Sequence, residues 1–453
     1  MPFALSAPLR CAAVVAIMAS SACVPPTVHS GSHGVATLVT GRTGVQPSWS
    51  VSDSGVRPRD PIPEGPLDIE AAIRLAIARN PRVQSTLAEV GIAQAELWQA
   101  STWPNPVLDY VHGYPESGVA VSNRGVGFAF VRALQVPLRR RIAAAELASV
   151  ERRVANDVFD VMVEVQRAYR TVQYAQQLLE LHQAVAAASA ASAAAARALR
   201  AAGNIPAPSL DSEEALAAQD VAEVSGADGE LADARAELAR LLGAGIADTA
   251  WSIPGRLPEP EATDWPLARA DSLALARRLD VAAARESIRA ASAAVGLSER
   301  FRFLADGTLG AAFEREPDGR FVGPTASAPF PLFDRGAAAI ARGRAVLRQQ
   351  VALHDALVVD VHADVRAQLA RVRNARQQAQ QLRTVVLPLR RRIVEGTQLH
   401  VNAMDLSVFA LLQARQGEIE AGRRYLEAVR DYWIARAGLE RATGGPLPTP
   451  VAP

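Results

Sequence analysis

Residues 158–175 read VFDVMVEVQRAYRTVQYA, and residues 358–375 read VVDVHADVRAQLARVRNA. Four valines and one alanine recur between the two stretches at a constant offset of 200 residues, so that Val158 corresponds to Val358 and Ala175 to Ala375. Within each stretch the apolar residues step by three and four, a 3.5-residue repeat typical of long helices that supercoil against neighbours. The spacing predicts two copies of one structural unit, an internal two-fold sequence repeat.

Two strand-like segments precede each long helix in the sequence. Residues 107–114 and 126–134 predict one β-hairpin, within 104–137, and residues 308–314 and 321–330 predict a second, within 302–332. Period-two alternation supports the strands, and Pro137 and Pro331 are expected to close the hairpins. A helix from residue 67 to 101 precedes the first hairpin, with Asp68 as its N-cap and a kink or restart at Asn80-Pro81.

Glycines predict where each long helix ends. Gly203 and Asn204 are expected to break the first, which spans about 138–202, and Gly396 and Thr397 to break the second. Return helices follow, at about 211–242 and 405–443. The expected organisation is a first repeat over 67–250, a Pro-rich connector over 251–266, a second repeat over 267–445 and a disordered tail over 446–453.

The N-terminus predicts export. Arg10, a short apolar run over 11–19 and the small residues before Cys23 predict a signal peptide over 1–22. Ser21-Ala22-Cys23 is similar to a bacterial lipobox, so we expect lipidation of Cys23 at the head of an extended lead-in over 23–66. The alternatives are ordinary cleavage nearby with an unmodified thiol, or a different start site.

Composition and motifs exclude several classes of function. The net charge is +1, so no global field favours nucleic acid. The sequence contains no Walker loop, no Gly-x-Ser-x-Gly and no His-Glu-x-x-His, and the seven histidines are not at ligand spacing with cysteine. We therefore expect no enzyme activity, no catalytic residues, no metal site and no cofactor.

Beyond the N-terminal segment, no stretch approaches the roughly 18 apolar residues of a spanning helix. Any membrane crossing would fall to the strands, whose open edges lipid does not tolerate. Four strands do not close a barrel, so several chains would have to share one: two chains would give eight strands, three twelve and four sixteen. The expected fold class is an α+β membrane protein in which a composite β-barrel is continued by a barrel of long coiled-coil helices.

Several motifs resemble the TolC family of outer-membrane efflux proteins over essentially residues 67–443. They include residues 76–81 (AIARNP), 103–106 (WPNP), 329–336 (PFPLFDRG) and Gly396 followed by 404–406 (MDL). Residues 313–319 (FEREPDG) and 331–336 (PLFDRG) look closest to the branch that serves heavy-metal pumps. The resemblance implies a homotrimer with a twelve-stranded barrel in outer-membrane lipid and a periplasmic helical tunnel. It also implies docking on a periplasmic adaptor (membrane fusion protein) and an inner-membrane RND-type pump.

The resemblance also implies roles for individual residues. Asp405 matches an acidic residue that lines the inner end of the tunnel, and Asp211 is its candidate counterpart in the first copy; both are candidate gate or selectivity residues. The alternative is that each is only an N-cap of its return helix. Gly203, Asn204, Gly396 and Thr397 are the candidate tips that contact the adaptor, with a C-cap as the local reason for each glycine.

The function that follows is a passive exit duct for drugs or metal cations delivered by a pump. Two alternatives remain open at this point: an outer-membrane duct for type I protein secretion, and a lipid-anchored periplasmic coiled-coil scaffold. The scaffold would explain the export signal and the heptads, but it would not require the two hairpins.

Overall fold

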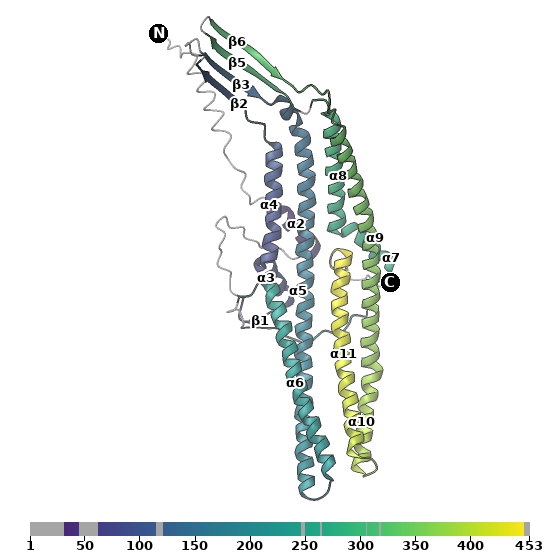
Figure 1. The fold of residues 1–453 in the computed structure, drawn as a ribbon. Coiled ribbons are helices and arrows are strands. Elements are labelled where there is room, and N and C mark those ends of the chain that lie inside the picture. The colour runs from purple at the N-terminus through teal and green to yellow at the C-terminus, as the bar shows by residue number, and fades with distance from the viewer. Residues whose placement is uncertain are drawn as a thin grey trace, which may run out of the picture.

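The computed structural model describes residues 31–44, 62–114, 121–245, 250–262, 265–304, 306–316 and 319–447. The molecule is elongated, with a four-stranded sheet at one end and long helices that run away from it to two helical tips (Figure 1). The predicted signal peptide, Cys23, the first hairpin's loop with Pro115 and Gly118, and most of the predicted tail lie outside the described residues.

The order of elements occurs twice. The first half contains α3 (Ile69–Arg79), α4 (Pro81–Ser101), β2 (Val107–Gly113), β3 (Val121–Phe128), α5 (Phe130–Ala201) and α6 (Ala207–Leu242). The second half contains α7 (Leu267–Arg277), α8 (Leu279–Arg300), β5 (Thr308–Glu316), β6 (Gly319–Ser327), α9 (Ala337–Gln381), the π-helix η2 (Leu382–Val386), α10 (Leu387–Asn402) and α11 (Val408–Thr443). Outside the two halves lie α2 (Gly31–Thr43) and a two-residue parallel pairing of β1 (Gly65–Pro66) with β4 (Trp251–Ser252).

Asp68 and Asn80 set the ends of the short helices as the sequence predicts. The Asp68 carboxylate accepts a hydrogen bond from the Ala71 N–H at 2.6 Å, which caps α3. Asn80 ends α3 and begins α4: its side chain accepts from the Arg82 N–H at 2.9 Å and donates to the Leu241 carbonyl at 2.9 Å. The predicted restart at Asn80-Pro81 is confirmed, because Pro81 at the first helical position needs no N–H partner.

The second predicted strand of the first hairpin is displaced: the sequence predicts it at 126–134, and β3 covers Val121–Phe128. β3 ends at Phe128 and α5 begins at Phe130, so residues 130–134 are helical and Pro137 lies inside α5 instead of closing the hairpin. Burial at the start of this helix alternates, with Val131, Ala133 and Gln135 buried, which imitates the period of a strand. The Val131 N–H reaches the Gly307 carbonyl at 3.4 Å, so a contact from the other half holds the first turn of the helix.

The four long strands form one antiparallel sheet in the order β2-β3-β5-β6. The central pairing joins the two halves and places Arg124 opposite Phe313 and Val126 opposite Ala311. Within the part of the chain that the structure describes, the outer strands β2 and β6 each pair with one neighbour. The two hairpins are therefore continuous, and their free edges lie at opposite sides of the sheet.

The numbering offset between equivalent residues of the two halves changes by one along the second long helix. Val165, Val172 and Ala175 of α5 and their counterparts at +200 are all buried. The buried residues of the return helices instead correspond at +201: Ala227, Ala234 and Leu238 of α6 match Ala428, Ala435 and Leu439 of α11. The second half therefore holds one extra residue between positions 375 and 428, and η2 lies in this interval. A π-turn, whose hydrogen bonds span one more residue than those of an α-helix, accommodates such an insertion.

Candidate functional site

The strand register divides the sheet into two faces of different chemistry. Paired residues of an antiparallel sheet share a face, and neighbours along a strand alternate. One face, called here the apolar face, carries three rows read across the four strands, which are Tyr110-Arg124-Phe313-Val322, Leu108-Val126-Ala311-Pro324 and the shorter Phe128-Leu309-Ala326. A polar row closes this face toward the hairpin loops: His112-Ser122-Arg315-Arg320.

The opposite face, called here the polar face, is more mixed. It carries several apolar residues, among them Val111 and Phe321, but also a carboxylate at Asp109, a hydrogen-bonded polar pair and many glycines. In that pair the Asn123 amide donates to Glu314 Oε1 at 3.0 Å across β3 and β5. The apolar face carries one cation within its rows, Arg124, whose guanidinium lies 5.7 Å from the centre of the Tyr110 ring. With this exception one face is apolar and the other polar and glycine-rich, so the sheet is amphipathic across its thickness.

No described helix covers the apolar face. Leu108 is 76% exposed, Val322 65% and Tyr110 64%, and Figure 1 shows the sheet extending beyond the ends of the helices. A contiguous exposed apolar surface of this kind marks a binding partner or a lipid environment. The free edges of β2 and β6 add backbone donors and acceptors that a further strand could pair.

The first tip, between α5 and α6, ends in a Schellman motif. Gly203 has φ of +76°, its N–H donates to the Arg200 carbonyl at 3.0 Å, and the Asn204 N–H donates to the Leu199 carbonyl at 2.9 Å. The expectation that Gly203 supplies a left-handed C-cap is confirmed. Asn204 lies exposed in the turn, next to the start of α6.

The second tip lies elsewhere than predicted. Gly396 and Thr397 are inside α10, which continues to Asn402, so the predicted helix break is wrong. The left-handed position is filled by Met404, with φ of +63°, whose N–H donates to the Val401 carbonyl at 3.0 Å. Glycine alone does not end a helix, and Gly396 has open space around it in an ordinary helical turn.

Neither candidate gate carboxylate is an N-cap. Asp405 follows Met404 in the turn: its N–H donates to the His400 carbonyl at 2.9 Å, and its Oδ2 lies 3.3 Å from His400 Nδ1. The residue before α11 is Ser407, whose side chain makes no capping bond. Asp211 is exposed inside α6, which begins four residues earlier at Ala207, because the helix continues through Pro208 in its first turn. Both carboxylates are therefore solvent-facing groups near the tips.

A buried carboxylate near the first tip has no signal in the sequence. Glu213 is 4% exposed, and its Oε2 accepts a hydrogen bond from Ser192 of α5 at 2.8 Å. The corresponding residue of α11, at +201, is Ala414, which is also buried. Only the packing of α5 against α6 distinguishes Glu213 from the exposed glutamates of the same helix.

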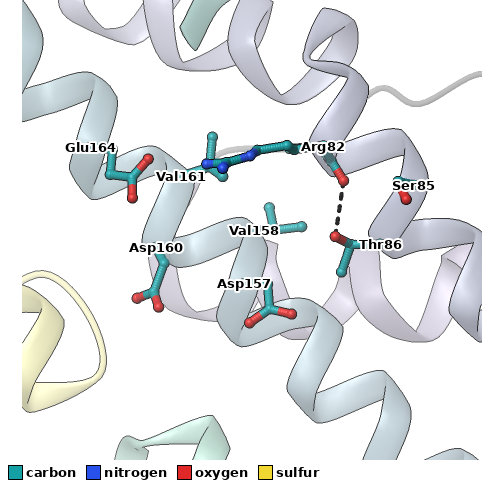
Figure 2. Close-up of a pocket in the computed structure, with 9 residues that line it drawn as sticks. Arg82, Ser85, Thr86, Asp157, Val158, Asp160, Val161 and Glu164 are labelled. Carbon is teal, nitrogen blue, oxygen red and sulfur yellow. Dashed lines mark hydrogen bonds between the residues drawn. The ribbon is translucent and has the colours of Figure 1, made fainter.

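A groove of about 320 Å³ lies between α4 and α5, with Asp157, Asp160 and Glu164 of α5 along one wall. Figure 2 shows these carboxylates on successive turns of α5, with Arg82 and Thr86 of α4 across the groove and the Asp160 carboxylate turned away from them. Burial raises the pKa of Asp157 above its usual range, and the neighbouring Asp160 carboxylate adds to this shift. Asp160 itself is held by Arg441 of α11, with contacts of 2.7 and 2.9 Å to its two carboxylate oxygens.

The described residues hold no group of three His, Cys, Asp or Glu side chains positioned to bind a metal ion. Among the same residues, no helix is both long and apolar enough to cross a bilayer.

Solved structures match this architecture closely. A membrane protein from Pseudomonas aeruginosa matches with a TM-score of 0.72 at 19% identity, over 89% of this chain and 98% of the other. The Neisseria gonorrhoeae MtrE outer-membrane channel in its open state gives a TM-score of 0.69 at 18% identity, over 83% and 89%. CusC gives 0.71 at 15% identity, over 83% and 92%.

The chain has the fold of TolC-family outer-membrane channels. No protein-family model and no curated protein sequence matches it. At these identities the comparison establishes the fold, which spans nearly the whole length of the matched channels and accounts for the sheet, the long helices and the two tips together.

Proposed function

We propose that this protein is the outer-membrane channel of a tripartite efflux system, a passive and non-enzymatic exit duct. The observation that carries the proposal is the amphipathic sheet, with an exposed apolar face, a polar face and two free edges at the end of a long helical body. The folds of CusC and MtrE, whose structures are described as channels, support it.

The barrel is a homotrimer in this proposal. The edge strand β6 of one copy pairs with β2 of the next, so that three four-stranded sheets close into twelve strands with no open edge. The apolar face meets lipid, and the row of His112, Arg315 and Arg320 meets the headgroups. The polar face lines a water-filled lumen, which lowers the barrier for polar solutes.

The helical body continues the duct into the periplasm. α5 contains 72 residues, which at 1.5 Å per residue gives a length of roughly 108 Å. The tips that contain Gly203, Asn204 and Met404 dock on a periplasmic adaptor, which connects to an RND-type pump that supplies the driving force. A ring of Asp405 carboxylates near the second tip attracts cations. The assignment to drug or metal cargo, and to the heavy-metal branch, rests on the sequence resemblance of residues 313–319 and 331–336.

Lipidation of Cys23 after removal of residues 1–22 is the proposed anchor. The cysteine precedes α2 by eight residues, and Val35 and Val39 of α2 are buried against the helical body. Cys23→Ser should remove incorporation of radiolabelled palmitate, while Cys11→Ser should leave it unchanged. Label that persists in the Cys23→Ser protein rules out this anchor.

Purified protein in detergent, followed by planar-bilayer recording, tests the function. A trimeric mass and ohmic conductance steps without ATP or pump are expected. A soluble monomer that needs no detergent and does not conduct would support the scaffold alternative instead.

A further inference from the structure

Given the trimer of the proposed function, on which this inference rests, the contacts between the two halves of one chain indicate which helices meet between neighbouring copies. The long helix α5 packs against α4 and α6 of its own half and against α8 and α11 of the other half. The corresponding long helix α9 packs mainly against α7, α8 and α11, which all belong to its own half. In a ring of alternating halves, the partners that α9 lacks are α4 and α6 of the next copy.

Exposure of equivalent residues agrees with this assignment. Ala283, Glu286 and Ala290 of α8 are buried, and the first two contact Ser149 and Arg152 of α5. Asn80 and Arg278 precede α4 and α8, so equivalent residues of these two helices differ by 198. The counterparts in α4 are Ser85, Ala88 and Ile92, which are all exposed, Ile92 to 61%. On the long helices, Phe159 is 7% exposed whereas its counterpart Val359 is 66% exposed.

The ion pair between the halves has an exposed counterpart. Asp160 of α5 is held by Arg441 of α11 through both carboxylate oxygens. The equivalent positions, at +200 and −201, are Asp360 on α9 and Arg240 on α6, so the sequence preserves both charges. Within one chain these two residues do not meet: Asp360 is exposed, and the half-exposed Arg240 binds Glu237 one turn away.

A small residue faces a large one at the contact between the halves, and the equivalent positions hold the reverse combination. Gly438 of α11 lies against Gln368 of α9 and the Arg167 guanidinium of α5, so that a Cβ added at Gly438 would be 2.5 Å from Gln368 Oε1 and 2.8 Å from Arg167 Nη2. At the equivalent positions the large and small partners are reversed, with Ala367 on α9 and Glu237 on α6. The space that Arg167 occupies between the halves is thus available to Glu237 between copies.

We propose that the α9 face with Val359, Asp360 and Ala367 docks on α4 and α6 of the next copy, with Asp360 bound to Arg240 of that copy. The contact is heterologous, because different surfaces of each copy meet, and in the proposed trimer a rotation of one third of a turn closes it into a ring. The buried pairs of α5 with α8 and α11 provide its geometry, and the opposite charges of Asp360 and Arg240 fix its register.

Cross-linking of the detergent-solubilised full chain tests this contact. Arg240→Cys with Asp360→Cys, treated with a short bis-maleimide, should give covalent dimers and trimers and nothing larger. Each single variant, and the parent with Cys11 and Cys23 alone, should lack this ladder. The matched control, Asp160→Cys with Arg441→Cys, should react within one chain and stay at monomer mass.

Charge exchange provides a second readout that does not depend on the linker. Asp360→Arg should cause loss of the trimer at lower temperature, and addition of Arg240→Asp should restore it. A protein that is trimeric and conducting, yet gives no 240–360 ladder and no restoration, would overturn this contact and leave the channel intact. A monomer that does not conduct would overturn both the contact and the proposed function.

Discussion

Met404 occupies in the second helical tip the left-handed position that Gly203 occupies in the first, with φ of +63° against +76°. The hydrogen bonds are also equivalent. The Asp405 N–H donates to the His400 carbonyl, and the Asn204 N–H donates to the Leu199 carbonyl, each at 2.9 Å. A non-glycine residue in this conformation costs about 1–2 kcal/mol. The two tips therefore have the same backbone geometry, but only the second has the conformational strain of a non-glycine residue. This strained residue, Met404, directly precedes the candidate gate residue Asp405.

Replacing Met404 by glycine should relieve that strain. We expect Met404→Gly to slow amide hydrogen exchange in the last turn of α10 by a factor that corresponds to about 0.5–1 kcal/mol, since part of the gain is offset by the flexibility of glycine in the open state. Gly203→Ala is the matched control and should accelerate exchange in the last turn of α5. Faster exchange in Met404→Gly would contradict the assignment of the turn.

Gly396→Ala tests the corrected position of the second tip. Because Gly396 lies inside α10 and an added Cβ meets nothing within 4 Å, alanine should stabilise the helix by about 0.5–1 kcal/mol. Hydrogen exchange across residues 393–400 measures this change. If Gly396 adopted the left-handed conformation of a tip, the same substitution would destabilise the helix instead.

The acidic groove of Figure 2 predicts a pH-dependent effect at Asp157. Burial and the Asp160 charge raise its pKa, so the folded state binds the proton more tightly than the unfolded state. Its contribution to stability is therefore most favourable below the unfolded value of 3.8 and decreases as pH rises through the raised folded pKa.

Asp157→Asn should therefore raise the thermal midpoint at pH 7, and the difference from the parent should disappear near pH 3.5. Ser85→Ala, at the opposite wall of the groove, is a control without a titrating group. A lower midpoint for Asp157→Asn at pH 7 would show that the carboxylate is favourable in the folded state.

Asp405→Asn tests the proposed gate. The Asp405 side chain is 65% exposed and only 3.3 Å from His400, so neutralising it should leave the turn intact while removing three negative charges from a trimer. Reversal potentials under a KCl gradient should shift toward lower cation preference. Asp211→Asn at the first tip is the comparison, and unchanged selectivity in both variants would remove the carboxylates from this role.

Local signals in the sequence predicted much of the fold. Asp68, Asn80-Pro81 and Gly203 act within a few residues of their own position, and the structure places them as expected. The first turn of α5 is held by the hydrogen bond from the Val131 N–H to the carbonyl of Gly307, 176 residues further along the chain, and was not predictable from a local pattern. Met404 carries no compositional sign of a left-handed residue, and the extra residue at η2 is visible only when burial in the two halves is compared.

The sequence predicted that strands form the candidate site, but not which residues share a face or make long-range contacts. Alternation identified the strands, but the division into an apolar and a polar face needed the register across β3 and β5. The buried Glu213 and the Asp160–Arg441 pair join segments 21 and 281 residues apart, so only the packed helices bring them together.

The most direct test of the account is accessibility of the two sheet faces in a conducting channel. Asn123→Cys on the polar face and Val126→Cys on the apolar face lie three residues apart on β3. In planar bilayers, a charged water-soluble methanethiosulfonate reagent should reduce conductance through Asn123→Cys and leave Val126→Cys unchanged. Modification of Val126→Cys but not Asn123→Cys, or of both equally, would contradict a sheet that places one face in lipid and the other along a lumen.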